Sequence, residues 1–542
     1  MRKILSRLTT DDHKTNFILL LIIFTSMILL SPKWNIGIFS FIVTSASLRY
    51  FRNTKLWKGS LFIFFVTSFA SFIANQGVMP FPIPIMVPII LFLGIIKLIP
   101  LLLDKILYRR MTGILSIFIY PASSIIVDSF IANSPNGTFG NIAYSLVDFN
   151  ALMQLASITG IWGIAFLIYL FAPVINHIIE NYNRYQTVKN FSIGYGLLFS
   201  SIVIFGLIRL QYGRDILSDA NSEKFGAVTS ENTNWSTAVH KAVSGKTVIL
   251  PKKIDQTSPQ LVEFQHSLNE FIKDHNLPKY DSVYISLEEY YKEIFTSSQI
   301  AVEDGAKIIL LSEGEIITFE DRESTLIDKA KEFALKNKVY FFFSMGTIYP
   351  EKMKINQPFI GNKILTISPE GIILDIYYKN VPVKDVDPSI PGDGIINVIN
   401  TPYGNLSPVI CYDADFPGLM RQTGEKDAEV VLVATGDWFS ISPYHTKIGI
   451  VRAIENGVSM LKTVSNGLSV AVDPFGNTIK EDDFFKDNGH IMVADIPTLK
   501  INTLYTIVGD FVVYASYLYL IIICFYLVII YLLKLRGGQS CF

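Results

Sequence analysis

Residues 409–413 read Val-Ile-Cys-Tyr-Asp, a short apolar run that ends in a thiol and a carboxylate. The run has the length and composition of a buried strand, and reactive groups often follow the end of such a strand. Cys411 is one of three cysteines, and the other two, Cys524 and Cys541, lie in or after the last apolar run of the chain. The globular part therefore holds one cysteine, which excludes a disulfide framework or a cysteine-based metal site within it. A lone cysteine is often a small buried residue, so its neighbours must indicate its role.

Two more apolar runs end in groups that could act on this thiol. Ile308–Leu311 leads into Ser-Glu-Gly, which contains Glu313, and Ile372–Tyr378 leads into Lys379. A thiol becomes a nucleophile when a base or a cation lies beside it. A carboxylate and an ammonium that converge on Cys411 would supply a proton acceptor and an oxyanion stabiliser. The spacing alone leaves the alternative open that each group is an ordinary strand-end surface residue.

Short apolar runs alternate with amphipathic stretches from Ala306 onward. The pattern predicts helices at 322–336 and 444–455. It predicts strands at 307–311, 339–349, 363–368, 372–378, 408–411, 429–434, 458–464 and 468–472. This alternation predicts an α/β domain with buried sheets.

The short sequence stretches around Glu313, Lys379 and Cys411 resemble known motifs. Leu-Ser-Glu-Gly-Glu at 311–315, Tyr-Tyr-Lys-Asn at 377–380 and the stretch at 409–413 are similar to the catalytic motifs of the nitrilase (carbon–nitrogen hydrolase) superfamily, in the same order. The resemblance implies an αββα sandwich. It also implies that Glu313 is the general base, that Lys379 stabilises the tetrahedral intermediate, and that Cys411 is acylated.

Further stretches resemble the membrane-embedded branch of that superfamily, the bacterial apolipoprotein N-acyltransferase family. They are Gln-Leu-Ala-Ser-Ile-Thr-Gly-Ile-Trp-Gly-Ile-Ala-Phe-Leu at 154–167, Gly-Asp-Trp-Phe at 436–439, Arg-Ala-Ile-Glu-Asn-Gly at 452–457 and Ser-Asn-Gly-Leu-Ser-Val-Ala-Val-Asp-Pro-Phe-Gly at 465–476. Trp438 and Phe439 are candidates for the lining of an acyl entrance, and ordinary loop aromatics are the alternative. His445 is expected to be structural or to position substrate rather than to bind a metal.

The sequence departs from the family pattern after the lysine. The run Val-Pro-Val-Lys-Asp-Val-Asp fills 381–387, so Asp387 stands eight residues after Lys379, where the family carries a second glutamate. Tyr412 and Asp413 are the other expected supporting residues, and Asp413 stands where the family often has glutamate. Residues 239–280 form an insertion that does not align with the family.

Half of the 542 residues are hydrophobic and only 17% are charged. Soluble domains carry about 25% charged residues, so this composition indicates a membrane protein. A helix needs about 20 apolar residues to cross a bilayer, and the second of the candidate segments is short by this measure. The candidate segments are 16–31, 35–48, 56–75, 84–103, 112–131, 155–178, 191–211 and 511–533. The predicted fold class is a polytopic α-helical bundle of about eight transmembrane helices with an α/β nitrilase-like sandwich domain.

Basic residues mark every second loop between these segments. They are Arg2, Lys3, Arg7 and Lys14, then Arg49, Arg52, Lys55 and Lys58, then Lys105, Arg109 and Arg110, then Arg184 and Lys189, and finally Lys534 and Arg536. The positive-inside rule then places both termini in the cytoplasm. It predicts a membrane domain with seven helices at 1–211, an extracytoplasmic catalytic domain at 212–508, and a last helix with a short tail at 509–542. The resemblance implies the inner membrane of a bacterial cell.

The resemblance implies an N-acyltransferase that works by a ping-pong mechanism. A phospholipid would acylate Cys411, and the N-terminal amine of a diacylated lipoprotein would accept the chain. No cofactor, metal or nucleic acid is expected. Two alternatives stay open: a membrane-anchored amidase that uses water, and an inactive homologue that binds lipid or lipoprotein. Asp128, near the outer end of the fifth segment, is predicted either to reach the headgroup layer or to face a substrate cavity.

Overall fold

The computed structural model describes residues 12–108, 110–111, 114–487 and 490–536. The chain falls into two compact units. Unit 1 holds Met1–Ala74, Pro84–Leu207 and Val508–Phe542, and unit 2 holds Asn75–Ile83 and Ile208–Ile507. The sequence placed residues 75–83 in the membrane domain, whereas the structure groups this short connection with unit 2.

Unit 1 is built from helices, and a helix forms at each of the eight predicted segments. These helices are α2 (His13–Leu29), α3 (Ile38–Asn53), α4 (Leu56–Ala74), α5 (Ile83–Leu107), α6 (Ile119–Ala132), α9 (Ile161–Glu180), α10 (Tyr185–Leu217) and α19 (Phe511–Arg536). Within the described residues, six spans are long and apolar enough to cross a membrane, namely α4, α5, α9, α10, α19 and the stretch 115–132 that contains α6. Helices α2 and α3 are shorter, with 17 and 16 residues.

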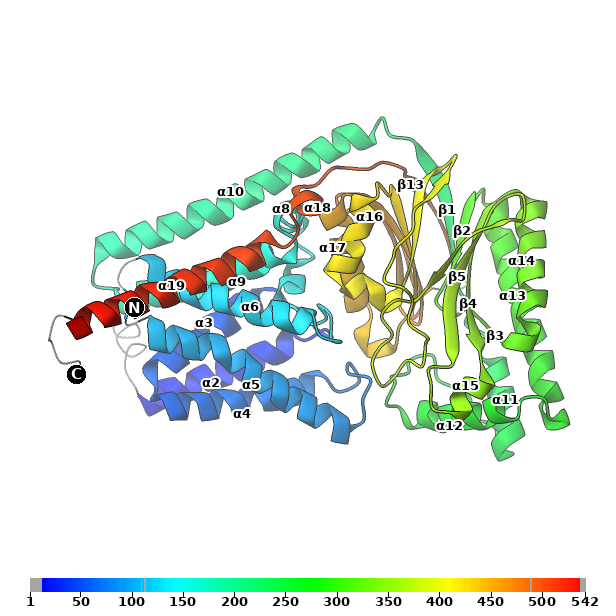
Figure 1. Cartoon of the computed structure of the whole chain (residues 1–542), viewed down its shortest axis with the longest axis horizontal. Helices are drawn as coiled ribbons and strands as arrows, with labels where there is room; N and C mark the ends of the chain where they lie inside the picture. The colour runs from blue at the N-terminus through cyan, green and yellow to red at the C-terminus, as the bar shows by residue number, and fades with distance from the viewer. Residues whose placement is uncertain (1–11, 109, 112–113, 488–489, 537–542) are drawn as a thin grey trace. The chain divides into compact units, whose positions relative to one another are not determined.

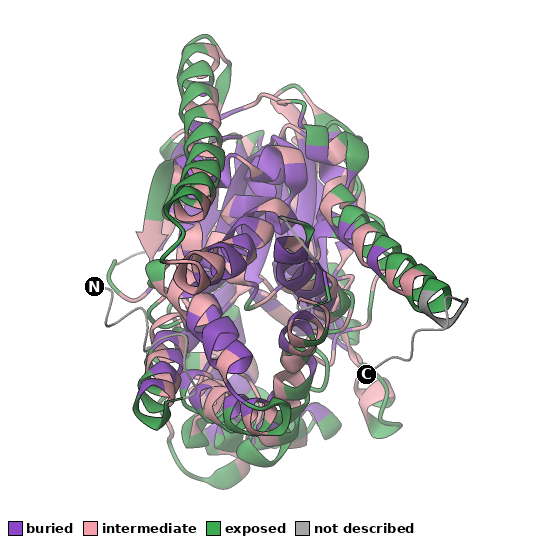
Figure 2. Cartoon of the chain, turned by 90° about the vertical axis from the view of Figure 1, so that its left-hand side faces the viewer, coloured by how far each residue is buried: buried purple, intermediate pink, exposed green. Residues whose placement is uncertain are grey.

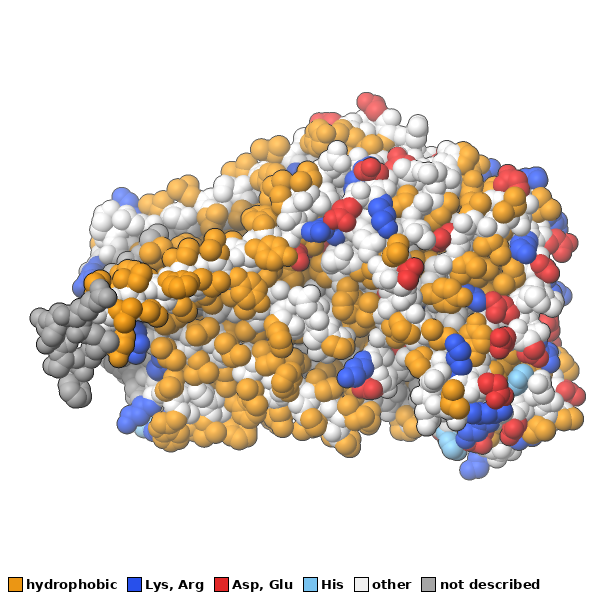
Figure 3. All heavy atoms as spheres, in the orientation of Figure 1, with side chains coloured by type: hydrophobic (Ala, Val, Ile, Leu, Met, Phe, Trp, Pro, Cys, Tyr) orange, Lys and Arg blue, Asp and Glu red, His pale blue; other side chains and the backbone are white. Residues whose placement is uncertain are grey.

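The outward surface of these helices is apolar. Large hydrophobic side chains such as Phe65, Phe92, Leu197 and Phe525 are more than half exposed. Figure 2 shows exposed residues along α19, the helix that ends at the C label, and Figure 3 shows hydrophobic side chains over most of the visible face of unit 1. A contiguous apolar surface of this size marks contact with another apolar phase, which here is the lipid bilayer.

Polar groups inside unit 1 pair with one another. Arg52 in α3 makes two hydrogen bonds of 2.8 Å to the buried carboxylate of Asp104 in α5. Asp128 accepts a hydrogen bond of 2.7 Å from the hydroxyl of Tyr169 in α9. Asp128 is therefore half-buried against a neighbouring helix.

Several residues used for the orientation prediction lie outside the described part of the chain, namely Arg2, Lys3, Arg7 and Arg109, and the side chains of Lys534 and Arg536 are not described.

Unit 2 contains two β-sheets. The first has the order β13-β1-β2-β4-β5-β6 with β3 beside β4, and the second has the order β12-β11-β10-β9-β8-β7. The strands of the first sheet are β1 (Ser222–Val228), β2 (Ile308–Leu311), β3 (Ile316–Phe319), β4 (Tyr340–Ile348), β5 (Ile360–Ile367), β6 (Ile373–Tyr378) and β13 (Ile491–Pro497). Those of the second are β7 (Ile399–Thr401), β8 (Gly404–Ile410), β9 (Val430–Gly436), β10 (Ser459–Ser465), β11 (Leu468–Val472) and β12 (Thr478–Asp483).

Helices cover the outer faces of both sheets, as Figure 1 shows. The helices α13 (Asp281–Glu303) and α14 (Glu323–Asn337) pack on the first sheet, and α16 (Pro417–Glu425) and α17 (Tyr444–Asn456) pack on the second. Because both faces of each sheet are covered, strands such as β4 are buried along their whole length and read as continuous apolar runs. The inner faces of the two sheets share one hydrophobic core, which contains Phe342, Val409 and Val433. The arrangement is an αββα sandwich, so the predicted fold class is confirmed.

The parallel strands fix where the candidate residues meet. Strand β8 pairs in parallel with β9, and Ile410 lies opposite Ala434. Strand β2 likewise pairs in parallel with β4. Since parallel strands end at the same edge of a sheet, the residues that follow β8 and β9 lie next to each other.

Candidate active site

Cys411 is the first residue after β8 and begins the 3₁₀ helix η5 (Cys411–Asp415). Its φ angle is +48°, in the left-handed region that non-glycine residues rarely occupy. Strain of this kind costs about 1–3 kcal/mol and is common at functional sites. The side chain is 6% exposed, and its sulfur donates to the carbonyl oxygen of Gly436 at 3.9 Å.

Glu313 follows β2 and is held on both carboxylate oxygens. One oxygen accepts from Lys379 Nζ at 2.7 Å and from Asn362 Nδ2 at 2.8 Å, and the other accepts from the backbone N–H of Gly436 at 2.9 Å. Gly436 therefore contacts both Glu313 and Cys411, so the carboxylate and the thiol meet at the end of β9. Asn362 was missed as a site residue, because it lies within a strand and no motif of the sequence analysis contains it.

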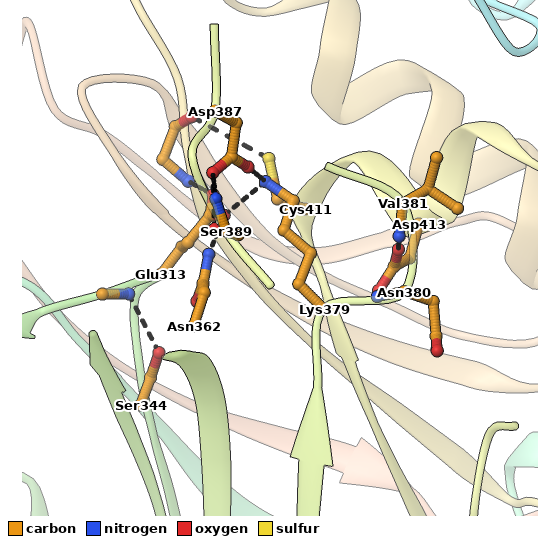
Figure 4. Close-up of polar contacts among 12 residues, drawn as sticks. Glu313, Ser344, Asn362, Lys379, Asn380, Val381, Asp387, Ser389, Cys411 and Asp413 are labelled. Atoms are coloured by element: carbon orange, nitrogen blue, oxygen red, sulfur yellow. Dashed lines mark hydrogen bonds and ion pairs between the residues drawn. The ribbon is translucent and has the colours of Figure 1, made fainter. Parts of the chain in front are cut away.

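Lys379, the residue after β6, places its ammonium between two carboxylates. Its Nζ lies 2.7 Å from Glu313 and 2.6 Å from Asp387, and its side chain is 3% exposed. Figure 4 shows the lysine extending toward these carboxylates and toward Cys411. The structure thus brings together four residues that were candidates from sequence, and Asp387 reaches the lysine although the run before it is altered.

Burial and charge set the protonation states of this cluster. Burial raises the pKa of the Cys411 thiol well above its ordinary value, and the charge of Glu313 raises it further. Burial alone would lower the pKa of Lys379, but Glu313, Cys411 and Asp387 raise it well above its ordinary value. Burial would raise the pKa of Asp387, but Lys379 lowers it. At neutral pH these shifts leave Cys411 as a thiol and Lys379 as an ammonium beside the carboxylate of Asp387, an arrangement that could supply a nucleophile with a cation beside it.

Two family models match this chain, one to each part. The carbon-nitrogen hydrolase model matches residues 277–503, and the model of the apolipoprotein N-acyltransferase N-terminal domain matches residues 17–174. The protein named apolipoprotein N-acyltransferase from Rickettsia prowazekii is 24% identical over 414 residues, which cover 72% of each chain. The protein of that name from Borreliella burgdorferi is 21% identical over 421 residues, 71% of this chain and 69% of its own.

The chain belongs to the apolipoprotein N-acyltransferase family. This family is a branch of the nitrilase superfamily, so the resemblance drawn from the sequence is confirmed, and the chain is a multi-pass membrane enzyme. An amidase structure from Nesterenkonia sp. matches 43% of this chain and 90% of its own, with 19% identity and a TM-score of 0.34. The two family models leave residues 175–276 unmatched, and this stretch includes most of the insertion that did not align by sequence.

Asp413 supports the turn after Lys379 in this member of the family. Its carboxylate accepts from the Tyr377 hydroxyl at 2.7 Å and from the backbone N–H groups of Asn380 at 3.1 Å and Val381 at 2.7 Å. Burial raises the pKa of Asp413 to about 6. Tyr412 packs edge-on against Phe416, with ring centroids 5.3 Å apart, and burial raises the pKa of its hydroxyl. The two residues therefore lie in different surroundings although they are neighbours in sequence.

Residues 436–440, called the aromatic loop below, begin beside Cys411. Trp438 donates its indole N–H to the carbonyl oxygen of Gly77 at 2.8 Å, and Phe439 is 39% exposed with its ring edge-on to Phe485. The exposure of Phe439 is compatible with a residue that lines an entrance for an acyl chain. Trp438 and Phe439 remain candidates for the contact with an acyl chain.

His445 is buried and contacts carboxylates in the two segments that follow β8 and β9. His445, in the first turn of α17, contacts Asp437 through Nδ1 at 2.6 Å and Asp415 through Nε2 at 3.3 Å. One side-chain atom from each of Cys411, Asp437 and His445 lies within 4.8 Å of the others. Both ring nitrogens thus face carboxylates, which favours a protonated imidazole in a positioning role. Asp437 and Asp415 were missed as site residues, although Asp437 belongs to the stretch Gly-Asp-Trp-Phe.

Replacing His445 by glutamine should lower stability by an amount that depends on pH. Burial lowers the pKa of His445, as does Lys462, but Asp437 and Asp415 outweigh both and raise it to about 9. Because this folded-state pKa lies above the unfolded value, the stabilisation is complete below about pH 6.5 and is lost as pH rises through about 9. We expect a loss of about 3 kcal/mol in the free energy of unfolding at pH 6, shrinking toward pH 9.5.

Denaturant unfolding of unit 2 by tryptophan fluorescence, repeated across this pH range, measures the difference between wild type and His445→Gln. The exposed His266 offers a matched control, since His266→Gln removes an imidazole from the surface of the same unit. A difference between wild type and His445→Gln that stayed constant from pH 6 to 9.5 would contradict the ion-paired imidazolium.

Proposed function

We propose that this enzyme moves a fatty acyl chain from a phospholipid to the N-terminal amine of a diacylated lipoprotein, through a thioester on Cys411. The observation that carries the proposal is the Lys379 ammonium held between Glu313 and Asp387 beside a buried thiol. The names of the relatives support lipoprotein N-acylation as the overall reaction. The apolar surface of unit 1 suits substrates that are both anchored in lipid.

In the first half-reaction, Glu313 accepts the thiol proton as the sulfur of Cys411 bonds to the ester carbonyl carbon of the phospholipid. Lys379 and backbone N–H groups stabilise the oxyanion that forms. The C–O ester bond then breaks, and the leaving lysophospholipid oxygen takes the proton from Glu313. A thioester remains on the enzyme.

In the second half-reaction, the lipoprotein amine attacks the thioester carbonyl carbon. Glu313 accepts a proton from the amine, the C–S bond breaks, and the proton passes to the departing sulfur. The product is an amide, and the thiol is restored. We further propose that the predicted topology holds, with residues 212–508 outside the cytoplasm, because both substrates would then meet the site at the outer leaflet.

Product analysis separates transfer to an amine from transfer to water. Purified full-length enzyme would be mixed with phospholipid that carries a labelled acyl chain, analysed by intact-mass spectrometry, and then given a diacylated lipopeptide. We expect a fatty-acyl mass increment that hydroxylamine removes, and label in a triacylated lipopeptide after the second addition. Label recovered only as free fatty acid would favour the amidase alternative. Failure to form any adduct or product would contradict both readings.

A further inference from the structure

The insertion at 239–280 contributes a loop to the active-site region. It contains most of α11 (Asn234–Ser244) and all of α12 (Pro259–Lys273), and residues 245–258 connect these helices. This connection runs beside the aromatic loop that follows β9. The carbonyl oxygen of Ile254 accepts a hydrogen bond of 3.0 Å from the backbone N–H of Phe439.

Asp255 binds the next residue of the aromatic loop with both carboxylate oxygens. Oδ1 accepts from the backbone N–H of Ser440 at 2.7 Å, and Oδ2 accepts from the Ser440 hydroxyl at 2.8 Å. Hydrogen bonds to an ionised carboxylate are roughly twice as strong as neutral ones. Two consecutive backbone N–H groups, of Phe439 and Ser440, are therefore held by the insertion.

A third segment meets the same loop from residues 75–83. The Trp438 indole donates to the Gly77 carbonyl at 2.8 Å, across 361 positions of sequence. Gly77 has a φ of +75°, and a Cβ built there would lie 2.6 Å from Asp255 Oδ2. Glycine at this position thus permits the close approach of the connection to the carboxylate. Trp438, Phe439 and Ser440 are fixed from two sides by segments that are remote in sequence.

The first residue of the aromatic loop, Gly436, lies next to Cys411. Gly436 accepts from the Cys411 sulfur, and Asp437 binds His445. A shift of the loop at Ser440 would therefore move Trp438 and Phe439 relative to Cys411. Phe439 also lies under Lys253, whose Nζ is 5.3 Å from the ring centroid, so the insertion covers one side of the exposed aromatic.

We infer that Asp255 is a positioning residue that fixes the Trp438–Phe439 loop as the acyl-chain receptor beside Cys411. The inference rests on the proposed function for the identity of the chain that binds there. It assigns a role in donor recognition to an insertion that lies mostly outside the stretches matched by the family models.

Three variants test the inference: Asp255→Ala, Asp255→Asn and, as a matched control from the same insertion, Asp274→Ala, which changes an exposed aspartate at the end of α12. We expect Asp255→Ala to raise the KM for phospholipid by about tenfold and to change kcat by less than about threefold. Asparagine keeps an oxygen for the Ser440 N–H and should recover part of the loss. Asp274→Ala should behave as wild type.

Two readouts do not depend on acyl transfer. Hydrogen exchange of peptides that cover residues 436–443 should accelerate in Asp255→Ala, less so in Asp255→Asn, and not in Asp274→Ala. The second readout is the rate of Cys411 alkylation by N-dodecyl chloroacetamide divided by the rate with chloroacetamide. This ratio should fall by about tenfold in Asp255→Ala. General damage to the site would change both rates together and leave the ratio unchanged. An unchanged ratio, or unchanged exchange at 436–443, would overturn the inference. If the wild-type enzyme transferred no acyl chain but the alkylation ratio still fell in Asp255→Ala, the proposed donor or acceptor would be wrong and the role of Asp255 would stand.

Discussion

Replacing Cys411 by alanine should lower the rate of acyl transfer by at least about 10⁴-fold, because Cys411 is the single cysteine of residues 208–507 and the proposed thioester needs its sulfur. The variant should still fold. The side chain lost is small, and alanine meets the left-handed backbone at this position with the same steric cost as cysteine. Transfer of labelled acyl chain to lipopeptide measures the effect, and circular dichroism checks the fold.

Cys524→Ala is the matched control for this change. Cys524 is exposed on α19, in unit 1, and we expect its replacement to leave the rate within twofold of wild type. Retention of more than about one percent of the rate in Cys411→Ala would show that the thioester route is wrong. A loss of equal size in both variants would indicate damage to the membrane helices instead.

Replacing Lys379 by methionine should have the second largest effect, on both rate and stability. The variant loses the cation proposed to stabilise the oxyanion, which costs about 10²–10³-fold in kcat. It also leaves the carboxylates of Glu313 and Asp387 buried without their shared cation, and breaking a buried pair costs about 3–5 kcal/mol. Turnover and denaturant unfolding at pH 7 measure the two losses.

The stability loss of Lys379→Met should become smaller at low pH. Lys379 holds the pKa of Asp387 below its ordinary value, so the stabilisation from this pair is present at neutral pH and is lost as pH falls and Asp387 is protonated. Lys384→Met serves as control, since Lys384 is exposed and lies five residues along the same loop. Stability of Lys379→Met equal to that of Lys384→Met at pH 7 would contradict the buried ion-pair cluster.

The sequence predicted unit 2 well because the patterns that indicate its strands and candidate site residues are local in the sequence. Strands buried on both faces appear as continuous apolar runs, and each predicted strand lies within four residues of the bounds in the structure, as at 360–367 against 363–368 and at 404–410 against 408–411. Glu313 and Cys411 follow such runs at the ends of β2 and β8, and Lys379 follows β6, which is apolar but only partly buried; the ends of these three strands bring the residues together. Asp387 was found by counting positions after Lys379, and the structure places it 2.6 Å from that lysine.

What the sequence did not predict depends on contacts between remote segments. Nothing near Asp255 indicates that its carboxylate binds Ser440, 185 positions later. Residues 75–83 were assigned to the membrane domain because they join two apolar helices. The structure groups them with unit 2, where Gly77 contacts Trp438 and approaches Asp255. The buried pair of Asp415 and Asp437 around His445 was missed because short polar residues in a loop have no periodic pattern.

The burial of Cys411 also has a bearing on oxidative damage. Peroxides and disulfides react with thiolates, whereas this sulfur is 6% exposed and its raised pKa keeps it protonated in the resting enzyme. It is also the single cysteine of residues 208–507, so no resolving thiol is at hand in this unit to reverse a sulfenic acid. Cys411 is consequently kept in its least oxidisable form in the resting enzyme. In the proposed mechanism it becomes reactive only when Glu313 accepts its proton as the sulfur bonds to a carbonyl carbon.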